Sequence, residues 1–63
     1  MRYQVQRRNG ANHVWRVLLD TASEREARER FLALSTTCER GEVRRVDTHD
    51  NQILERAAAR RVA

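Results

Sequence analysis

The sequence predicts a small α+β domain of the ββαββ type, in which one helix packs on an antiparallel sheet. Three observations predict it: two strand-like segments flank Asn9-Gly10, a capped amphipathic segment follows from about residue 23, and a strand-turn-strand pattern occupies residues 42–56. With 63 residues, the chain has room for one domain, residues 1–63. A domain of this size buries only about 60% of the surface that its unfolded chain exposes, so we expect one thin core.

The first predicted element is a hairpin made of residues 2–8 and 12–19, with Asn9-Gly10 as the turn signal. We prefer a three-residue loop with Gly10 in the left-handed conformation, because it sets Tyr3 across from Trp15. The apolar face of this hairpin then holds Tyr3, Val5, Trp15, Val17 and Leu19. The reverse face is a candidate binding surface and holds Arg2, Gln4, Gln6, Arg8, Val14, Arg16 and Leu18.

The second predicted element is a helix over about residues 23–37. Thr21 and Ser23 each precede a glutamate by three positions, which is the spacing of a capping box at a helix start. Leu32 falls on the polar side of this helix, where an exposed leucine is either incidental or an anchor for a partner. The apolar stripe at helical spacing consists of Ala27, Phe31, Leu34 and Cys38.

The last predicted elements are two strands joined by a polar turn. Residues 42–48 form the third strand, residues 49–51 the turn and residues 52–56 the fourth strand. A helix over residues 52–62 is the alternative, because three consecutive alanines favour one. With the strand preferred, residues 57–63 become a frayed or helical tail.

The charge of the chain points toward an anionic partner. All 13 basic side chains are arginine, and the formal net charge is +4. An arginine excess attracts nucleic acid, an acidic protein face or an anionic membrane, and guanidinium grips phosphate or carboxylate through two parallel hydrogen bonds. A GC-rich genome, which replaces lysine codons with arginine codons, is the alternative explanation for the arginine usage.

The sequence offers no constellation for catalysis, metal binding or cofactor binding. Cys38 with His13 or His49 would be the available nucleophile and bases, but Cys38 falls on the predicted core stripe. Zinc-ligand spacings are missing, and with Gly10 and Gly41 as the two glycines there is no phosphate-cradling loop. The large apolar residues are too few to wall a deep substrate pocket. We therefore expect no enzyme, no metal and no cofactor.

The sequence shows no targeting signal. No apolar run approaches a membrane span, Met1 is not followed by a signal-peptide core, and the single cysteine fits a reducing compartment. These features predict a cytoplasmic protein, located in the host cytoplasm if a phage encodes it, without membrane attachment. We expect a monomer or a weak homodimer.

Residues 41–54, Gly41-Glu42-Val43-Arg44-Arg45-Val46-Asp47-Thr48-His49-Asp50-Asn51-Gln52-Ile53-Leu54, follow a short capped helix. This arrangement resembles the second half of small phage-encoded anti-CRISPR proteins of type I systems. The resemblance implies an inhibitor that docks on a CRISPR surveillance complex and blocks DNA binding or nuclease recruitment. It carries over no functional residue.

Residues 15–27 are similar to the strand-into-helix passage of the small arm-binding domains of tyrosine recombinases, in which a sheet face enters a DNA groove. That family has three strands before the helix, whereas two are expected here. This second resemblance implies a DNA-binding module, because arginine pairs with guanine and glutamine with adenine in the major groove. The implied base readers are Arg2, Gln4, Gln6, Arg8 and Arg16.

The sequence therefore predicts a small non-enzymatic binding protein, with the phage or mobile-element inhibitor as the leading hypothesis and direct DNA binding as the alternative. An accessory or regulatory protein, including a toxin or antitoxin partner, is a third class. The expected partner is a larger protein or nucleoprotein complex. The candidate partner-binding residues are Arg2, Gln4, Gln6, Arg8, Arg16, Leu32, Arg44, Arg45 and Arg56.

Overall fold

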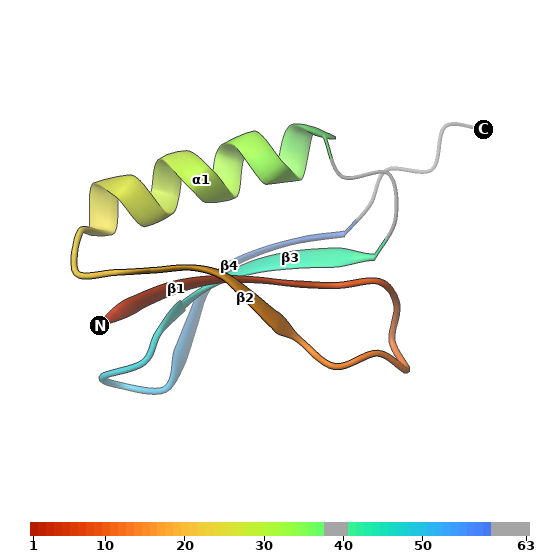
Figure 1. The fold of residues 1–63 in the computed structure, drawn as a ribbon, viewed down its shortest axis with the longest axis horizontal. Coiled ribbons are helices and arrows are strands. Elements are labelled where there is room, and N and C mark those ends of the chain that lie inside the picture. The colour runs from red at the N-terminus through yellow and green to blue at the C-terminus, as the bar shows by residue number, and fades with distance from the viewer. Residues whose placement is uncertain (38–40, 59–63) are drawn as a thin grey trace.

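The computed structural model describes residues 1–37 and 41–58, and it has one helix lying across one face of a four-stranded antiparallel sheet (Figure 1). The elements are β1 (Tyr3–Arg8), β2 (Arg16–Thr21), α1 (Glu24–Thr37), β3 (Glu42–Asp47) and β4 (Gln52–Ala58). The strand order is β2-β1-β3-β4, so the chain after the helix returns to pair β3 with β1. This confirms the predicted ββαββ fold.

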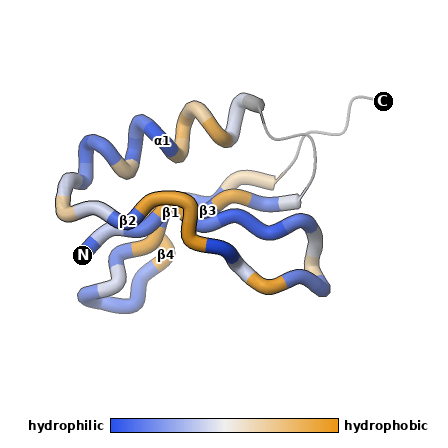
Figure 2. The backbone as a smooth tube through the Cα atoms, viewed as in Figure 1, coloured by the Kyte–Doolittle hydropathy of each residue, from blue (hydrophilic) through white to orange (hydrophobic). Residues whose placement is uncertain are grey.

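The core lies between α1 and the two central strands. Its buried apolar side chains are Val5 of β1, Val43 of β3, and Ala27 and Phe31 of the helix. Partly buried apolar residues around this centre are Tyr3, Leu19, Leu34 and Ala57. The predicted helix stripe is thus confirmed for Ala27, Phe31 and Leu34, while Cys38 lies outside the described residues. In Figure 2 the rest of the helix is largely hydrophilic, as expected for a helix with one buried side.

The start of the helix is capped as its sequence predicts. The Ser23 hydroxyl accepts a hydrogen bond from the backbone N–H of Glu26 at 3.2 Å, and the Ser23 carbonyl accepts the N–H of Ala27 at 3.1 Å. Thr21, which is buried, accepts the N–H of Ser23 at 3.1 Å and donates to the Glu26 carboxylate at 3.3 Å. These bonds satisfy amides that the first helical turn leaves without partners.

The predicted register of the first hairpin is wrong. The turn runs from Gly10 to His13, whose N–H donates to the Gly10 carbonyl at 3.0 Å, and β2 begins only at Arg16. Tyr3 therefore pairs with Thr21 instead of Trp15. A register shift between Val5 and Gln6 adds a bulge opposite them. Because of the longer loop and the bulge, Leu19 stays on the same face as Val5, but Val17 lies on the opposite face with Gln6.

Two backbone positions explain how the strands end. Gly41 has a φ of 78°, and a Cβ there would lie 1.9 Å from the carbonyl oxygen of Arg8. Asn51 has a φ of 53° in the turn between β3 and β4. The left-handed conformation predicted for Gly10 is wrong, because the positive φ values fall on Gly41 and Asn51. Both residue types tolerate this conformation better than others do.

The C-terminal segment forms a strand where the sequence left two alternatives. β4 extends to Ala58, so the helix considered for residues 52–62 is wrong over its first seven positions. Ala57 pairs with Val43 and packs against the core, and this tertiary contact overrides the helix propensity of alanine. The predicted frayed or helical tail over residues 57–63 is therefore wrong at Ala57 and Ala58, which belong to β4, while residues 59–63 lie outside the described residues. Within the part of the chain that the structure describes, no helix is long and apolar enough to cross a membrane.

Candidate functional site: the uncovered sheet face

The face of the sheet opposite α1 carries no covering element in the described chain, and we call it the uncovered face. Successive side chains of a strand alternate between the two faces of a sheet. The residues next to buried Val5 and Val43 in the chain therefore lie on the uncovered face, and so do the cross-strand partners of those residues. The uncovered face therefore consists of Gln4, Gln6, Arg8, Trp15, Val17, Asp20, Glu42, Arg44, Val46, Ile53 and Arg56.

Trp15 and two arginines form the centre of one half of this face. The guanidinium carbon of Arg44 lies 4.0 Å from the centroid of the Trp15 ring, and that of Arg8 lies 4.6 Å from it. A guanidinium over an indole ring is attracted to the negative potential of the ring face. Trp15 lies in the loop before β2, and its ring packs against arginines of β1 and β3 instead of in the hydrophobic core. The predicted place of Trp15 and Val17 in the core is therefore wrong.

Glu42 fixes the two arginines on either side of it. Its carboxylate accepts hydrogen bonds from Arg8 and from Arg56, the latter at 2.5 Å between Nη2 and Oε1. These hydrogen bonds, first that of Arg56 and then that of Arg8, lower the pKa of Glu42 below its ordinary value. The carboxylate remains charged at neutral pH, and the three side chains form a rigid row across β1, β3 and β4.

Arg44 differs from its neighbours because it has no carboxylate partner among the described residues. Its Nε donates to the Gln6 Oε1 at 2.7 Å, and the Gln6 amide donates in turn to Gln4 at 2.9 Å. Burial, followed by repulsion from Arg8 and Arg56, lowers the pKa of Arg44 from its ordinary value. Arg44 stays a cation at any physiological pH, but an oriented one whose charge is not neutralised.

Apolar side chains complete the face. Val17 of β2 and Ile53 of β4 are 51% and 50% exposed, and half-buried Val46 of β3 lies beside Ile53. Exposed apolar residues are common singly, but here they share one face with a half-buried aromatic-arginine cluster. The combination of aromatic, arginine and aliphatic groups is typical of protein-binding surfaces.

The structure brings five of the nine predicted binding residues together. Gln4, Gln6, Arg8, Arg44 and Arg56 all lie on the uncovered face, and the hydrogen bonds described above join them into two groups. Alternation along the first strand predicted Gln4, Gln6 and Arg8, because a strand with a buried valine places its polar neighbours opposite. It was not used to predict Arg44 and Arg56. Trp15 was missed, since its loop position follows from a register that the sequence does not specify.

The other four predicted residues lie elsewhere. Leu32 is exposed on the outer side of α1. Arg16 pairs with Arg7, on the side of the sheet opposite Gln6, so its predicted place on the same face as Gln6 is wrong. Arg45 is buried between sheet and helix, so its assignment as a surface binding residue is wrong. Arg2 lies just before β1, at the end of the two central strands, and forms an ion pair with Asp47.

Arg45 and Arg2 are structural cations. The Nε of Arg45 donates to Glu55 at 2.9 Å, and its Nη1 lies 3.6 Å from Glu24 at the helix start. The guanidinium of Arg2 donates to both oxygens of Asp47 at 3.0–3.2 Å. This pair, together with the N–H of His49, lowers the pKa of Asp47.

Comparison of the chain with protein-family models, curated proteins and solved structures finds no match. Within residues 1–37 and 41–58, no group of three histidine, cysteine, aspartate or glutamate side chains gathers as a metal site would require. We therefore base the functional proposal on the uncovered face.

Proposed function

We propose that this protein is a small, non-enzymatic binding protein whose uncovered face docks on an acidic surface of a larger protein. The observation that carries the proposal is the contact of the Trp15 ring with the guanidinium groups of Arg8 and Arg44 on an open sheet face. Tryptophan and arginine are the residues most enriched among those that dominate binding energy at protein interfaces. Val17 and Ile53 extend this centre with exposed aliphatic surface.

Pre-organisation supports the same proposal. Arg8 and Arg56 are fixed by Glu42, and Arg44 is fixed by Gln6, so these long side chains lose little further freedom when a partner binds. Ordering such a side chain at an interface otherwise costs about 0.5–1.5 kcal/mol. The uncompensated charge of Arg44 supplies complementarity to a carboxylate on the partner.

Inhibition of a nucleic-acid-handling complex is the biological setting we propose, as in the anti-CRISPR class. The sign of the charge restricts how such an inhibitor would work. A face with uncompensated arginine cannot imitate the phosphate backbone, so the mechanism is steric blockade from an acidic site on the complex and not mimicry of DNA. An inhibitor of this kind acts in the cytoplasm of the cell that holds its target.

Affinity capture with paired variants tests the proposal. Trp15→Ala/Arg44→Gln removes the centre of the uncovered face, and Leu32→Ala/Arg28→Gln removes one exposed leucine and one arginine from the outer side of α1. From nuclease-treated lysate, we expect the wild-type chain and the helix variant to retain one stoichiometric protein partner and the face variant to lose it. Loss of the partner in the helix variant alone would place the interface on α1 and refute the proposal.

Direct binding of duplex DNA is a second candidate, favoured by Arg7, Arg16 and Arg44, which have no acidic partner in the described chain. For each phosphate that a protein neutralises, log affinity falls by about 0.9 per log unit of salt. Duplex binding with a slope near −3, reduced by substitution of these three arginines, supports this candidate. Weak binding that no arginine variant changes would exclude it.

A further inference from the structure

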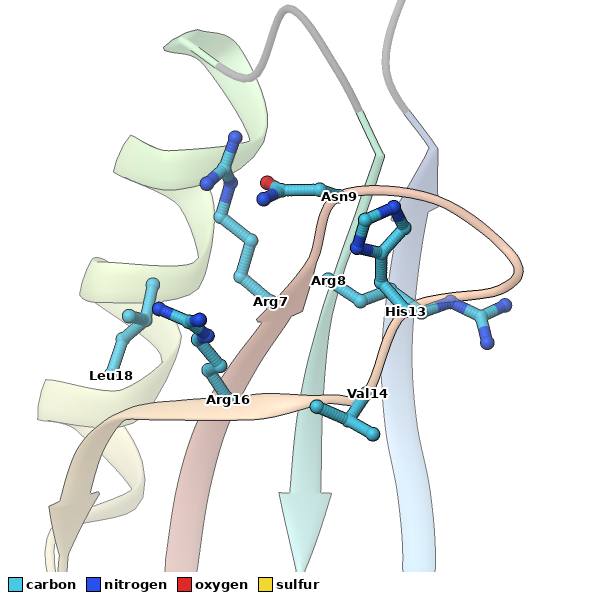
Figure 3. A pocket seen from close by; sticks show the side chains of 7 residues that line it. All are labelled: Arg7, Arg8, Asn9, His13, Val14, Arg16 and Leu18. Carbon is cyan, nitrogen blue, oxygen red and sulfur yellow. The ribbon is translucent and has the colours of Figure 1, made fainter.

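Beside the uncovered face, the first hairpin forms a hollow of about 190 Å³ whose lining shares Arg8 with that face (Figure 3). Its lining contains three arginines, a histidine and an asparagine, and no acidic residue: Arg7, Arg8, Asn9, His13, Val14, Arg16 and Leu18. At about 30 Å³ per water molecule, the hollow has room for a small hydrated anion. It is too small for a nucleotide or a drug-sized ligand, which need about 300 Å³ or more.

Two of these arginines face each other without compensation. Arg7 of β1 and Arg16 of β2 are direct cross-strand partners, and neither has an ion pair within residues 1–37 and 41–58. Like charges directly opposite on a sheet are destabilising. Figure 3 shows both side chains extending on the same side of the hairpin, while Arg8 extends away from them. An anion between Arg7 and Arg16 would turn this repulsion into attraction.

The loop adds hydrogen-bond donors to the charges. The turn from Gly10 to His13 carries the His13 ring back over Gly10, where its Cδ2 lies 3.5 Å from the position that a Cβ would occupy. His13 and Asn9 line the hollow beside the guanidinium groups (Figure 3). Guanidinium, imidazole and amide N–H groups are all donors to an oxyanion.

We infer that this hollow binds a phosphate group. Arg7 and Arg16 are permanent cations without a counter-charge among the described residues, and together they match a dianion, whereas a single carboxylate would neutralise only one of them. Phosphate also offers more acceptor oxygens than a carboxylate, one pair for each guanidinium fork. This inference goes beyond the proposed function, because it requires no protein partner and rests on Arg7 and Arg16, which lie outside the Trp15 cluster.

The test is titration of the purified chain with inorganic phosphate at low and constant ionic strength, with sodium chloride and sodium acetate as reference salts. Arg7→Gln/Arg16→Gln removes both cations, and Arg28→Gln/Arg30→Gln on α1 makes the same charge change elsewhere. We expect phosphate to raise the unfolding temperature above that in either reference salt. Affinity for phosphate should fall about ten-fold or more in the hairpin variant and remain in the helix variant.

The chain has two histidines, which provide an internal control in the wild-type protein. We expect the imidazole resonances of His13 to shift with saturation on phosphate addition and those of His49 to stay in place. An equal effect of acetate or chloride, retention of affinity in the hairpin variant, or equal shifts at both histidines would each overturn the inference. Because no partner is present, these outcomes are independent of the capture experiment.

Discussion

The two faces of one sheet use arginine in opposite ways. On the side that α1 covers, Arg45 is buried and its charge is matched by Glu55 and Glu24. On the uncovered face, Arg44 is stacked on Trp15 and has no carboxylate partner in the described residues. Pairing of a buried cation prevents a large destabilisation. An unpaired cation that is held in place contributes little to stability and leaves its charge available for binding.

Stability and binding should therefore separate between the two faces. Apolar burial is concentrated in Val5, Ala27, Phe31 and Val43 on the covered side. The uncovered face carries the larger aromatic group, Trp15, outside this cluster. Substitutions on the covered side should unfold the chain, whereas those on the uncovered face should leave it folded and unable to bind.

The largest expected effect is that of Phe31→Ala, which should reduce the free energy of unfolding by about 3–5 kcal/mol. Phe31 is 5% exposed and lies at the centre of the helix-sheet contact. At roughly 0.05–0.15 kcal/mol per residue, a domain of 63 residues has only about 3–9 kcal/mol in total, so urea denaturation should show a variant that unfolds at a much lower urea concentration or is already partly unfolded without urea. Phe31→Leu should retain most of the stability, and Leu32→Ala should change it by about 0.5 kcal/mol or less. Equal stability of the Phe31→Ala and Leu32→Ala variants would contradict the helix register.

Gly41→Ala should destabilise the fold by about 1–3 kcal/mol, because it strains the left-handed backbone and places a methyl group against the Arg8 carbonyl. Gly10→Ala is the matched control, since a Cβ there would meet its nearest neighbour at 3.5 Å, an ordinary contact. Thermal unfolding of the two variants should therefore differ clearly. A larger loss at Gly10 than at Gly41 would show that the strand ends are placed incorrectly.

Trp15→Ala should cost about 1–2 kcal/mol, the sum of two arginine-indole contacts of about 0.5–1 kcal/mol each. Circular dichroism should show a folded protein. A loss as large as that of Phe31→Ala would place Trp15 in the core and remove the difference between the faces.

Acid should weaken the fold through one carboxylate on each face. Hydrogen bonds from Arg2 lower the pKa of Asp47, and those from Arg56 and Arg8 lower the pKa of Glu42. The folded chain therefore binds these protons less readily than the unfolded chain, so this stabilisation is complete at neutral pH and declines below about pH 4. In urea denaturation from pH 7 to pH 2, Asp47→Asn and Glu42→Gln should each show a shallower decline than the wild type. Decline as steep as that of the wild type in both variants would assign the acid sensitivity to other groups.

Local patterns in the sequence were sufficient for the elements, but not for the way they pair. The Ser23 cap, the stripe of Ala27, Phe31 and Leu34, and the break at Gly41 predicted the helix and the strand after it. The predicted register of the first hairpin was wrong because Asn9-Gly10 is only a local turn signal. The actual register depends on Leu19 pairing with Val5 beneath the helix, a contact that no short segment specifies.

The same limit applies to the candidate site. Alternation around Val5 predicted Gln4, Gln6 and Arg8 on one face, and their positions do not depend on the register of the hairpin. Trp15 could not be located in this way, because its position depends on a seven-residue loop between β1 and β2. Arg44 and Arg45 are adjacent arginines with opposite roles, and only the direction of each side chain separates them.

Fluorescence quenching tests the central claim most directly, because Trp15 is the only tryptophan in the chain. If the ring lies on the uncovered face against Arg8 and Arg44, iodide, which the arginines attract, should quench the native protein strongly, and caesium should quench it weakly. Arg44→Gln should reduce that difference, whereas Arg28→Gln on the helix should leave it unchanged. Native emission that resists both ions until urea unfolds the chain would show a core tryptophan and contradict the account.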